Sequence, residues 1–402
     1  MNVLYFGKIC DEELFKKKQL QEEPFFIAQY LFEKALCNQF TEDNKVEIDI
    51  VSIYQTNYFP EDILFFNRKN KSGIRYLKFL NLPYLRELSY FISTCIQILF
   101  WFVKNINKKD KCIYSSCHFP PVSLAIVIMG RLLFLKKVVT FTDLSLFTYS
   151  DDKIGKMKLY KRVIIKPYIL LVNKLQKSYD GYILFAEEMN HIVNTRNKPY
   201  IMIEGMYNND NLNLVNVVKE NAIAHAGTLN KEVGIETILN VFNEIKDDSI
   251  ELWLIGKGDM NEEIIKRASI DKRIKYLGFM PRKEVFEKLK QARLLLNLRD
   301  PEDLYTKYSF PSKMFEFMVS GTPVLTTRIK GIPREYYNYI YAVDSYNIQD
   351  IKNKVIEVLN KNDLESEHIG KNAQQFIINN KNKEKQTGKV ISFIKGIQEI
   401  NN

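Results

Sequence analysis

A lysine and a glutamate three residues apart, Lys313 and Glu316, are the side chains of this sequence best suited to hold a ligand. Residues with this spacing share one face of a helix, so an ammonium group and a carboxylate would stand side by side. Such a pair suits a sugar nucleotide, with Lys313 on the diphosphate and Glu316 accepting hydrogen bonds from the ribose. An ordinary ion pair on a helix surface, worth under about 1 kcal/mol, fits the spacing equally well. The spacing alone leaves both interpretations open.

The residues around this pair predict a short helix with marked ends. Ser309 is expected to cap it, Pro311 suits its first turn and Gly321 ends it. The apolar strand at 294–298 precedes it, so the amino end of the helix would lie at the carboxyl edge of a sheet. Backbone amides and the helix dipole attract a phosphate to such an end, where the hydroxyls of Ser309 and Ser312 add donors.

The chain that must position this helix alternates short apolar strands with longer helices, twice over. Strands are expected at 3–6, 47–53, 112–115, 138–141, 181–185, 200–203, 222–225, 250–255, 274–277, 294–298, 324–326 and 340–343. Helices are expected at 25–35, 88–103, 122–134, 235–244, 261–269, 282–291, 313–320 and 347–360. This α/β alternation predicts two Rossmann-like domains with doubly wound parallel sheets facing a cleft. Ligands of such sheets bind beyond the carboxyl ends of the strands.

The domain boundaries follow from where this pattern restarts. We expect a first domain at 1–205, a second at 206–380, and a C-terminal helix at 381–402 that could pack back on the first domain. The polar stretch 207–213 is the best linker candidate.

The composition limits the class of protein. With 402 residues, 46% hydrophobic and 26% charged, the chain is globular and neither collagen-like, disordered nor disulfide-stapled. The five cysteines form no CxxC pair, which predicts a reduced, cytoplasmic setting. No spacing of His, Cys or carboxylates fits a metal site, so we expect no metal and no cofactor. The longest run without charge, 88–103, is shorter than the roughly 18 residues of a spanning helix.

The positive charge is concentrated in the first half. Residues 1–205 hold 29 Lys and Arg against 21 Asp and Glu, and 153–177 holds eight cations, interleaved with apolar residues, and no acid. That segment suits an anionic membrane surface, although it also fits a solvated helix face. Nucleic acid could also bind such a segment, but no nucleic-acid-binding motif accompanies the segment. Since 88–103 is also followed by lysines, we predict a protein peripheral on the inner face of the cell membrane, with no nucleic-acid partner.

Five segments of the second half together resemble a known family. They are Ala-Gly-Thr-Leu at 226–229, Gly-Ile at 234–235, Leu-Ile-Gly-Lys-Gly at 254–258, Tyr-Leu-Gly-Phe at 276–279, and Phe-Pro-Ser-Lys-Met-Phe-Glu-Phe-Met-Val-Ser-Gly-Thr-Pro-Val at 310–324. In this order they resemble the carboxy-terminal domain of the retaining family 4 glycosyltransferases, which have the GT-B fold. The branch of bacterial capsule and exopolysaccharide assembly is the most similar.

The resemblance implies an enzyme that moves a hexose from a UDP- or GDP-sugar to a hydroxyl of a lipid-linked glycan, with retention. The first domain would then bind the acceptor and the second the nucleotide sugar. Developing charge on the leaving diphosphate would be stabilised by cations and helix amides instead of a metal. No residue is named as general base.

At matching positions the resemblance implies roles for individual residues. Glu316 would hold the ribose, and Tyr308 stands where the family has a glutamate near the transferred sugar. Thr228 and Val233 stand where many members have the Arg and Lys that hold the diphosphate. Lys313 is therefore expected to take that role.

The remaining donor residues come from loops after strands. Lys231 or Arg299 would assist Lys313 at the diphosphate. Gly278 and Phe279 match the loop near the base, and Gly227 and Gly256 lie in the glycine-containing ends of two strands. The list of expected donor-binding residues is Gly227, Thr228, Lys231, Gly256, Gly278, Phe279, Arg299, Tyr308, Ser309, Ser312, Lys313 and Glu316.

In the first half, His118 and Asp143 are the candidate catalytic residues. Each follows an expected strand and so lies at its carboxyl end. In the family, a histidine at a place comparable to His118 contacts the donor sugar. If Asp143 is not a site residue, it is expected to cap a helix. His225 lies inside a strand and is expected to be structural. Glu204 and Gly205, at the crossing between domains, could touch a ligand or merely end a strand.

Two other functions stay open. A nucleotide-sugar epimerase of the same fold would need acid and base carboxylates, which the sequence does not place convincingly. A non-catalytic subunit that binds a sugar nucleotide for a partner enzyme would account for Tyr308 in place of a glutamate.

Overall fold

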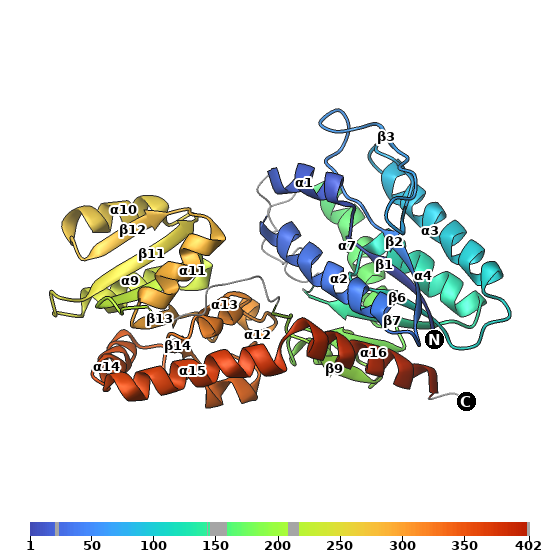
Figure 1. Cartoon of the computed structure of the whole chain (residues 1–402). Helices are drawn as coiled ribbons and strands as arrows, with labels where there is room; N and C mark the ends of the chain where they lie inside the picture. Colours follow the sequence, from blue (N-terminus) through green and yellow to red (C-terminus); the bar gives the residue numbers. More distant parts are fainter. Residues whose placement is uncertain (21–23, 143, 145–158, 208–216, 400–402) are drawn as a thin grey trace. The chain divides into compact units, whose positions relative to one another are not determined.

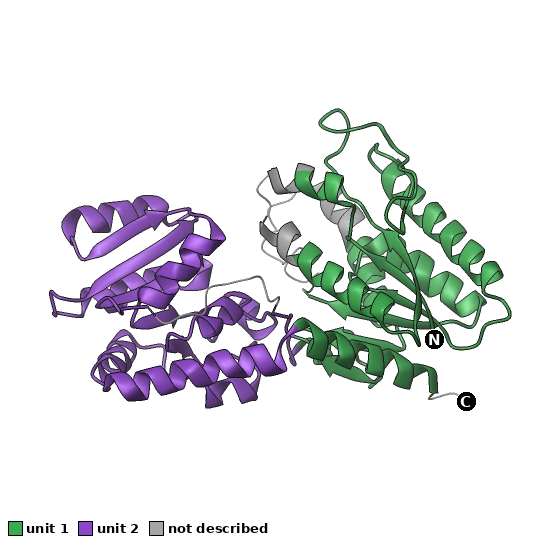
Figure 2. Ribbon diagram, in the orientation of Figure 1, with its two compact units in different colours: residues 1–185, 189–203, 383–402 green, residues 186–188, 204–382 purple. Residues whose placement is uncertain are grey.

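The computed structural model describes residues 1–20, 24–142, 144, 159–207 and 217–399. The chain forms two compact units (Figure 2). Unit 1 comprises Met1–Phe185, Met189–Ile203 and Lys383–Asn402, and unit 2 comprises Ala186–Glu188 and Glu204–Asn382.

Unit 1 is built on a seven-stranded sheet in the order β4-β2-β1-β6-β7-β8-β9, in which all neighbouring strands are parallel. Its strands are β1 (Asn2–Gly7), β2 (Glu47–Ser52), β4 (Ile74–Tyr76), β6 (Lys111–Ser115), β7 (Lys136–Phe141), β8 (Gly181–Leu184) and β9 (Tyr200–Met202). The central strand β1 is buried along its whole length, as expected for a strand covered on both faces. A separate antiparallel pair joins β3 (Phe65–Phe66) to β5 (Phe79–Leu80).

The helices of unit 1 come from both ends of the sequence. They are α1 (Glu12–Leu20), α2 (Pro24–Glu42), α3 (Leu85–Lys104), α4 (Pro120–Leu132), α7 (Leu159–Gln176), α8 (Met189–Val193) and α16 (Lys383–Glu399). Helix α3 packs on α4 and α4 on α7, whereas α16 packs on α2 and along β6 to β9 (Figure 1). Val390, Ile394 and Ile397 of α16 are buried there.

Unit 2 has a six-stranded parallel sheet in the order β12-β11-β10-β13-β14-β15. Its strands are β10 (Ala222–Thr228), β11 (Glu251–Lys257), β12 (Ile274–Gly278), β13 (Leu294–Asn297), β14 (Val324–Thr327) and β15 (Tyr341–Val343). Numbered along the chain, this is the 3-2-1-4-5-6 order of a Rossmann sheet, whose switch point lies between β10 and β13.

Helices cover both faces of this second sheet. They are α9 (Ile235–Asn243), α10 (Asn261–Ile270), α11 (Arg282–Gln291), α12 (Leu304–Lys307), α13 (Lys313–Val319), α14 (Ile348–Leu359) and α15 (Asp363–Asn380), with 3₁₀ turns η1 (Lys231–Val233) and η2 (Arg334–Asn338). Leu252 and Leu254 of β11 join the core under α9 and α14, and Trp253 between them joins the core under α11 and α13. This alternation is the period of two of a strand buried on both faces. The predicted pair of doubly wound parallel sheets is confirmed.

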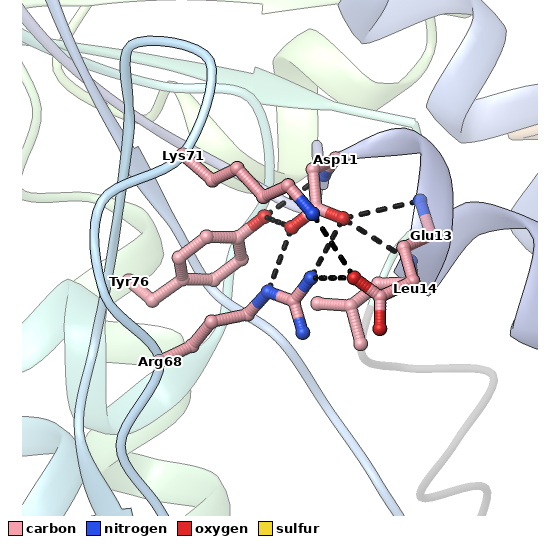
Figure 3. A network of polar contacts seen from close by, with 6 residues as sticks. All are labelled: Asp11, Glu13, Leu14, Arg68, Lys71 and Tyr76. Atoms are coloured by element: carbon pink, nitrogen blue, oxygen red, sulfur yellow. Dashed lines mark hydrogen bonds and ion pairs between the residues drawn. The ribbon is translucent and has the colours of Figure 1, made fainter.

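The loop that leaves β1 is held by a network around Asp11 (Figure 3). The Tyr76 hydroxyl donates to Asp11 Oδ2 at 2.7 Å, and Arg68 donates to both carboxylate oxygens from Nε and Nη2 at 2.8 and 2.9 Å. Arg68 Nη2 also reaches Glu13 Oε2 at 2.8 Å. Burial opposes ionisation of Asp11, but the hydrogen bonds from Tyr76 and Arg68 outweigh it, so its pKa is lowered. The network ties the first turn of α1 to the segment that leads into β4.

In the part of the chain that the structure describes, no helix has both the length and the apolar character to cross a membrane.

Candidate active site

Strands β10 and β11 each have a glycine near the carboxyl end, so no side chain separates the two backbones there. Gly227 and Gly256 have φ values of 144° and 138°, which L side chains rarely adopt. A Cβ on Gly256 would lie 1.8 Å from the carbonyl oxygen of Gly227, so the two strand ends approach closely. A Cβ on Gly227 would lie 3.4 Å from Lys313 Cγ. The Lys313 side chain therefore runs along the open side of Gly227.

Glu316 is held between two cations. Lys313 Nζ lies 2.8 Å from Glu316 Oε2, and Arg282 Nε lies 3.0 Å from Oε1. The Glu316 side chain is 18% exposed. Its burial raises the pKa, but Lys313 and Arg282 outweigh that effect and lower it, so the group is a carboxylate at neutral pH. It is a hydrogen-bond acceptor next to Lys313, whose side chain runs along Gly227.

Arg282 was not predicted from the sequence as a site residue. It lies at the start of α11, four residues after Gly278 at the end of β12. A cation that follows a strand by one short loop reaches the carboxyl edge of the sheet. That spacing is the signal that could have identified it.

Arg299 follows β13 and is buried, with 8% of its surface exposed. Its Nε and Nη1 have no hydrogen-bond partner among the described residues. The guanidinium lies 5.7 Å from the centre of the Tyr305 ring, and burial lowers its pKa. A Cβ on Gly234 would lie 1.7 Å from the carbonyl oxygen of Leu298, so the start of α9 presses against this loop. A buried cation whose N–H groups lack acceptors lowers the stability of the folded protein unless an anion pairs with it.

His225 lies beneath these cations as a neutral imidazole. It is buried in β10, and its Nδ1 donates to the carbonyl oxygen of Leu296 at 2.8 Å. Burial lowers its pKa to about 4, helped by the charges of Arg299 and Lys313. Its ring meets Phe317 edge-on at 5.9 Å. His225 is thus part of the core that supports the site.

The prediction that Ser309 caps the helix is wrong. Helix α13 begins at Lys313, its N-cap is Ser312, and the Ser312 side chain makes no capping hydrogen bond. Ser309 lies four residues before Lys313 and is buried. Between the two, Pro311 and Ser312 form a turn in which the Met314 amide donates to the Pro311 carbonyl. A helix of only seven residues has a small dipole. An anion at this place would therefore be bound by the side chains around the helix and not by its amino end.

The other predicted donor residues lie on loops of the same unit. Thr228 is exposed at the end of β10, and Tyr308 is half-buried at the end of α12. Lys231 already has a carboxylate partner, since its Nζ lies 2.8 Å from Glu236 on the surface. After Gly278, the ring of Phe279 is exposed, with Lys257 Nζ 4.6 Å from its centre. An exposed aromatic ring of this kind suits stacking on a planar base.

In unit 1, His118 lies in the loop between β6 and α4. Its Nδ1 is 3.1 Å from the Ser123 hydroxyl, its ring packs near Phe141 at 5.4 Å, and burial lowers its pKa to about 3. Its Nε2 is buried and has no partner among the described residues. The ring is therefore neutral, at the carboxyl edge of its sheet. Asp143 lies outside the described residues.

Glu204 has a structural partner inside unit 2. Lys381 Nζ lies 2.9 Å from Glu204 Oε1 and 2.6 Å from Glu335 Oε1, and the side chains of Lys381 and Glu204 are both 2% exposed. Of the two alternatives for Glu204, this contact supports the structural one. Among the residues described, no group of three or more His, Cys, Asp or Glu side chains could hold a metal ion.

Residues 211–376 match a family model described as glycosyl transferases group 1. This part of the chain is thus similar to the group 1 glycosyl transferases. Gly227, Arg299, Lys313 and Glu316 all lie inside the matched residues. A search of curated protein sequences finds no significant match.

Several solved structures are similar to the whole chain. Sucrose-phosphate synthase from Thermosynechococcus elongatus has a TM-score of 0.61 and 12% identity, covering 99% of each chain. HepE from Anabaena, in complex with UDP, has a TM-score of 0.59 and 13% identity, covering 98% of this chain and 100% of that one. The lipopolysaccharide outer core galactosyltransferase WaaB has a TM-score of 0.60 and 11% identity, covering 98% and 99%. The chain around the matched residues thus has the GT-B fold.

Proposed function

We propose that this protein is a retaining glycosyltransferase of the family 4 type. It would move a hexose from a UDP- or GDP-sugar to a hydroxyl of a lipid-linked glycan in surface polysaccharide synthesis. The observation that carries the proposal is the buried guanidinium of Arg299, whose Nε and Nη1 have no hydrogen-bond partner among the described residues, in the same unit as Lys313 and Glu316. A diphosphate is an anion that such a group would bind in a planar, charge-assisted contact.

Each of the three side chains has a distinct role in this proposal. Arg299 and Lys313 hold the diphosphate and stabilise the charge that develops on it when the sugar leaves. Glu316 stays ionised and accepts hydrogen bonds from the ribose hydroxyls, in line with its lowered pKa. Lys313 is 43% exposed at its side chain, so it can exchange part of its contact with Glu316 for a phosphate oxygen. In this proposal cations, and not a metal ion, stabilise the leaving diphosphate.

The neighbouring structures support the class of donor. HepE was crystallised with UDP, and also with UDP-glucose. TarM from S. aureus was crystallised with UDP and α-GlcNAc-glycerol. By similarity of fold, we propose a nucleoside diphosphate sugar for this chain as well, with the base stacked near Phe279.

On the acceptor side we propose unit 1, with His118 contacting the transferred sugar through Nε2. A peripheral position on the inner face of the membrane would bring a lipid-linked acceptor within reach. The basic segment 153–177 supports this position. Residues 153–158 lie outside the described residues, while Lys166 and Lys174 are exposed on α7.

The direct test is to incubate the purified protein with UDP- and GDP-sugars, with and without a lipid-linked glycan, and to measure released nucleoside diphosphate. Release that needs the acceptor supports the transferase. Interconversion of sugars without release would instead indicate an epimerase. Binding without either reaction would indicate a non-catalytic subunit, which Tyr308, in place of the family's glutamate, keeps as the second candidate.

Glu316→Ala gives a sharper test of the site. We expect donor affinity to fall by about 100-fold, because a charge-assisted contact to the ribose contributes roughly 1.5–3 kcal/mol. Glu263→Ala is the matched control, since Glu263 pairs with Arg267 on the exposed side of α10 in the same unit. Equal donor binding by both folded variants would exclude the ribose role.

A further inference from the structure

Helix α3 exposes an apolar face. It packs on the rest of unit 1 through four buried side chains, some polar and some apolar: Tyr90, Thr94, Ile98 and Trp101. The opposite side carries Leu88, Ile92, Ile96, Leu99 and Val103, which are 46–58% exposed. These five residues, here named the α3 face, follow the three- and four-residue steps of one helix stripe. A helix on the surface of a globular protein normally carries polar residues at such positions.

The α3 face belongs to a larger apolar surface. Of the 27 large apolar side chains exposed among the described residues, 17 lie in the segments 58–65, 84–106 and 128–134. The first segment adjoins the start of α3, since the Tyr58 hydroxyl donates to Glu87 at 2.7 Å. The last adjoins its end, because α3 and α4 run side by side into neighbouring strands (Figure 1). Such a concentration marks an interaction surface and not scattered exposure.

Cations gather at the carboxyl end of this surface. Lys104, the last residue of α3, and Lys109 after it are exposed, and Arg131 is exposed near the end of α4. Lys104 lies 3.6 Å from Asp49, and the adjacent Lys108 pairs with Glu47, so the acids at this end are already matched by bases. No charged residue interrupts the stretch 88–103. The surface is thus apolar along its length and basic at one edge.

We propose that the α3 face docks on an anionic lipid bilayer. Its apolar side chains enter the boundary between headgroups and acyl chains, while Lys104, Lys109 and Arg131 contact the anionic headgroups. Charge complementarity identifies lipid as the partner, because each cation near such a surface contributes attraction. The apolar surface also continues to the next helix, where α7 packs on α4 and exposes Leu170. A broad, apolar surface of this kind fits a flat bilayer.

This inference deepens the membrane position proposed above and rests on it, but it names a different surface from 153–177. Its test needs no sugar transfer, so the two proposals fail separately. Donor binding is measured on the same preparations. A wild-type protein that binds the donor but does not bind the vesicles would exclude only the docking face.

The experiment is co-sedimentation with phosphatidylcholine vesicles that contain about one third phosphatidylglycerol. The double variant Ile92→Glu/Ile96→Glu should bind at least about tenfold more weakly, since two charges replace inserted apolar groups. The matched control is Ile265→Glu/Ile270→Glu, two exposed isoleucines of α10 in unit 2, which should bind like the wild type. Ile92→Ser/Ile96→Ser is the milder pair, and circular dichroism checks folding of each.

The charge contribution has its own test. Lys104→Gln/Lys109→Gln should weaken binding to the anionic vesicles by roughly tenfold and leave the weak binding to pure phosphatidylcholine unchanged. The proposal is overturned if the wild type does not sediment with the vesicles, or if the α3 and α10 variants bind alike. It is also overturned if light scattering shows a dimer that Ile92→Glu/Ile96→Glu dissociates, because the face would then join two copies of the chain.

Discussion

Two arginines, one in each unit, are placed in opposite electrostatic surroundings. Arg68 of unit 1 is 22% exposed at its side chain and contacts the carboxylates of Asp11 and Glu13 (Figure 3). Arg299 of unit 2 is more deeply buried, and two of its nitrogens lack partners among the described residues. The arginine of unit 1 is thus paired with carboxylates, whereas the arginine of unit 2 has nitrogens without a hydrogen-bond partner among the described residues. We infer that Arg68 holds the fold together, whereas Arg299 is completed by a ligand.

The strongest test of this comparison is Arg299→Met. Donor affinity should fall by about 1,000-fold, since two charge-assisted hydrogen bonds contribute roughly 1.5–3 kcal/mol each. The variant should unfold at no lower temperature, because methionine removes a buried charge whose burial Tyr305 and Asp303 offset only in part. Titration calorimetry with UDP and GDP, and thermal unfolding, measure the two effects. A variant that binds the nucleotide normally and unfolds early would make Arg299 a structural residue.

The mirror substitution is Arg68→Met. We expect a loss of about 3 kcal/mol in the free energy of unfolding, because Asp11 would be left buried without its cation. Donor affinity of the folded protein should stay within about twofold, since Arg68 lies in unit 1. Denaturant unfolding and calorimetry test both points. Unchanged stability would show that the Asp11 network does not hold the fold.

The pH dependence of stability distinguishes the two regions further. Asp11 has a lowered pKa in the folded protein, so it contributes stability above its unfolded value of about 4. That contribution is lost as the pH falls through the folded pKa. Wild-type protein should therefore lose more stability than Asp11→Asn between about pH 5 and pH 2. Parallel curves from urea unfolding at several pH values would contradict the assigned role.

The smallest effect is expected for Lys231→Ala. Lys231 is exposed and paired with Glu236, so the change should alter stability by under about 0.5 kcal/mol. Donor affinity should change by less than about threefold if Arg299 and Lys313 hold the diphosphate. A large loss of donor affinity would move the diphosphate toward Lys231. The inference that Arg299 is the arginine that binds the ligand would then be refuted.

Most strands could be predicted from the sequence, because a strand buried on both faces is a short, continuous apolar run. The runs at 138–141 and 274–277 match β7 and β12 within two residues. Strand β4, only three residues long, and helix α1, with few apolar residues, lack such a pattern. They form because tertiary contacts such as the Asp11 network hold them.

Only the contacts of the site that join residues close in the sequence could be predicted. Lys313 and Glu316 were predicted as partners because they are three residues apart, and they lie 2.8 Å from each other. Arg282 reaches Glu316 across 34 residues of sequence, which no local pattern encodes. The missing partners of Arg299 are likewise a property of the packed unit. A sequence names cations, but only the fold determines which of them are neutralised.

Helix α16 has a consequence for how the protein is made. It belongs to unit 1, where Ile397 fills the space beside Gly181, yet the ribosome synthesises it after all of unit 2. Unit 2 can therefore finish folding while the nascent unit 1 still lacks a helix over β6 to β9. A stretch of apolar sheet stays uncovered during that interval, and such surfaces attract chaperones or aggregate. Unit 1 can therefore complete its fold only after unit 2 has been synthesised.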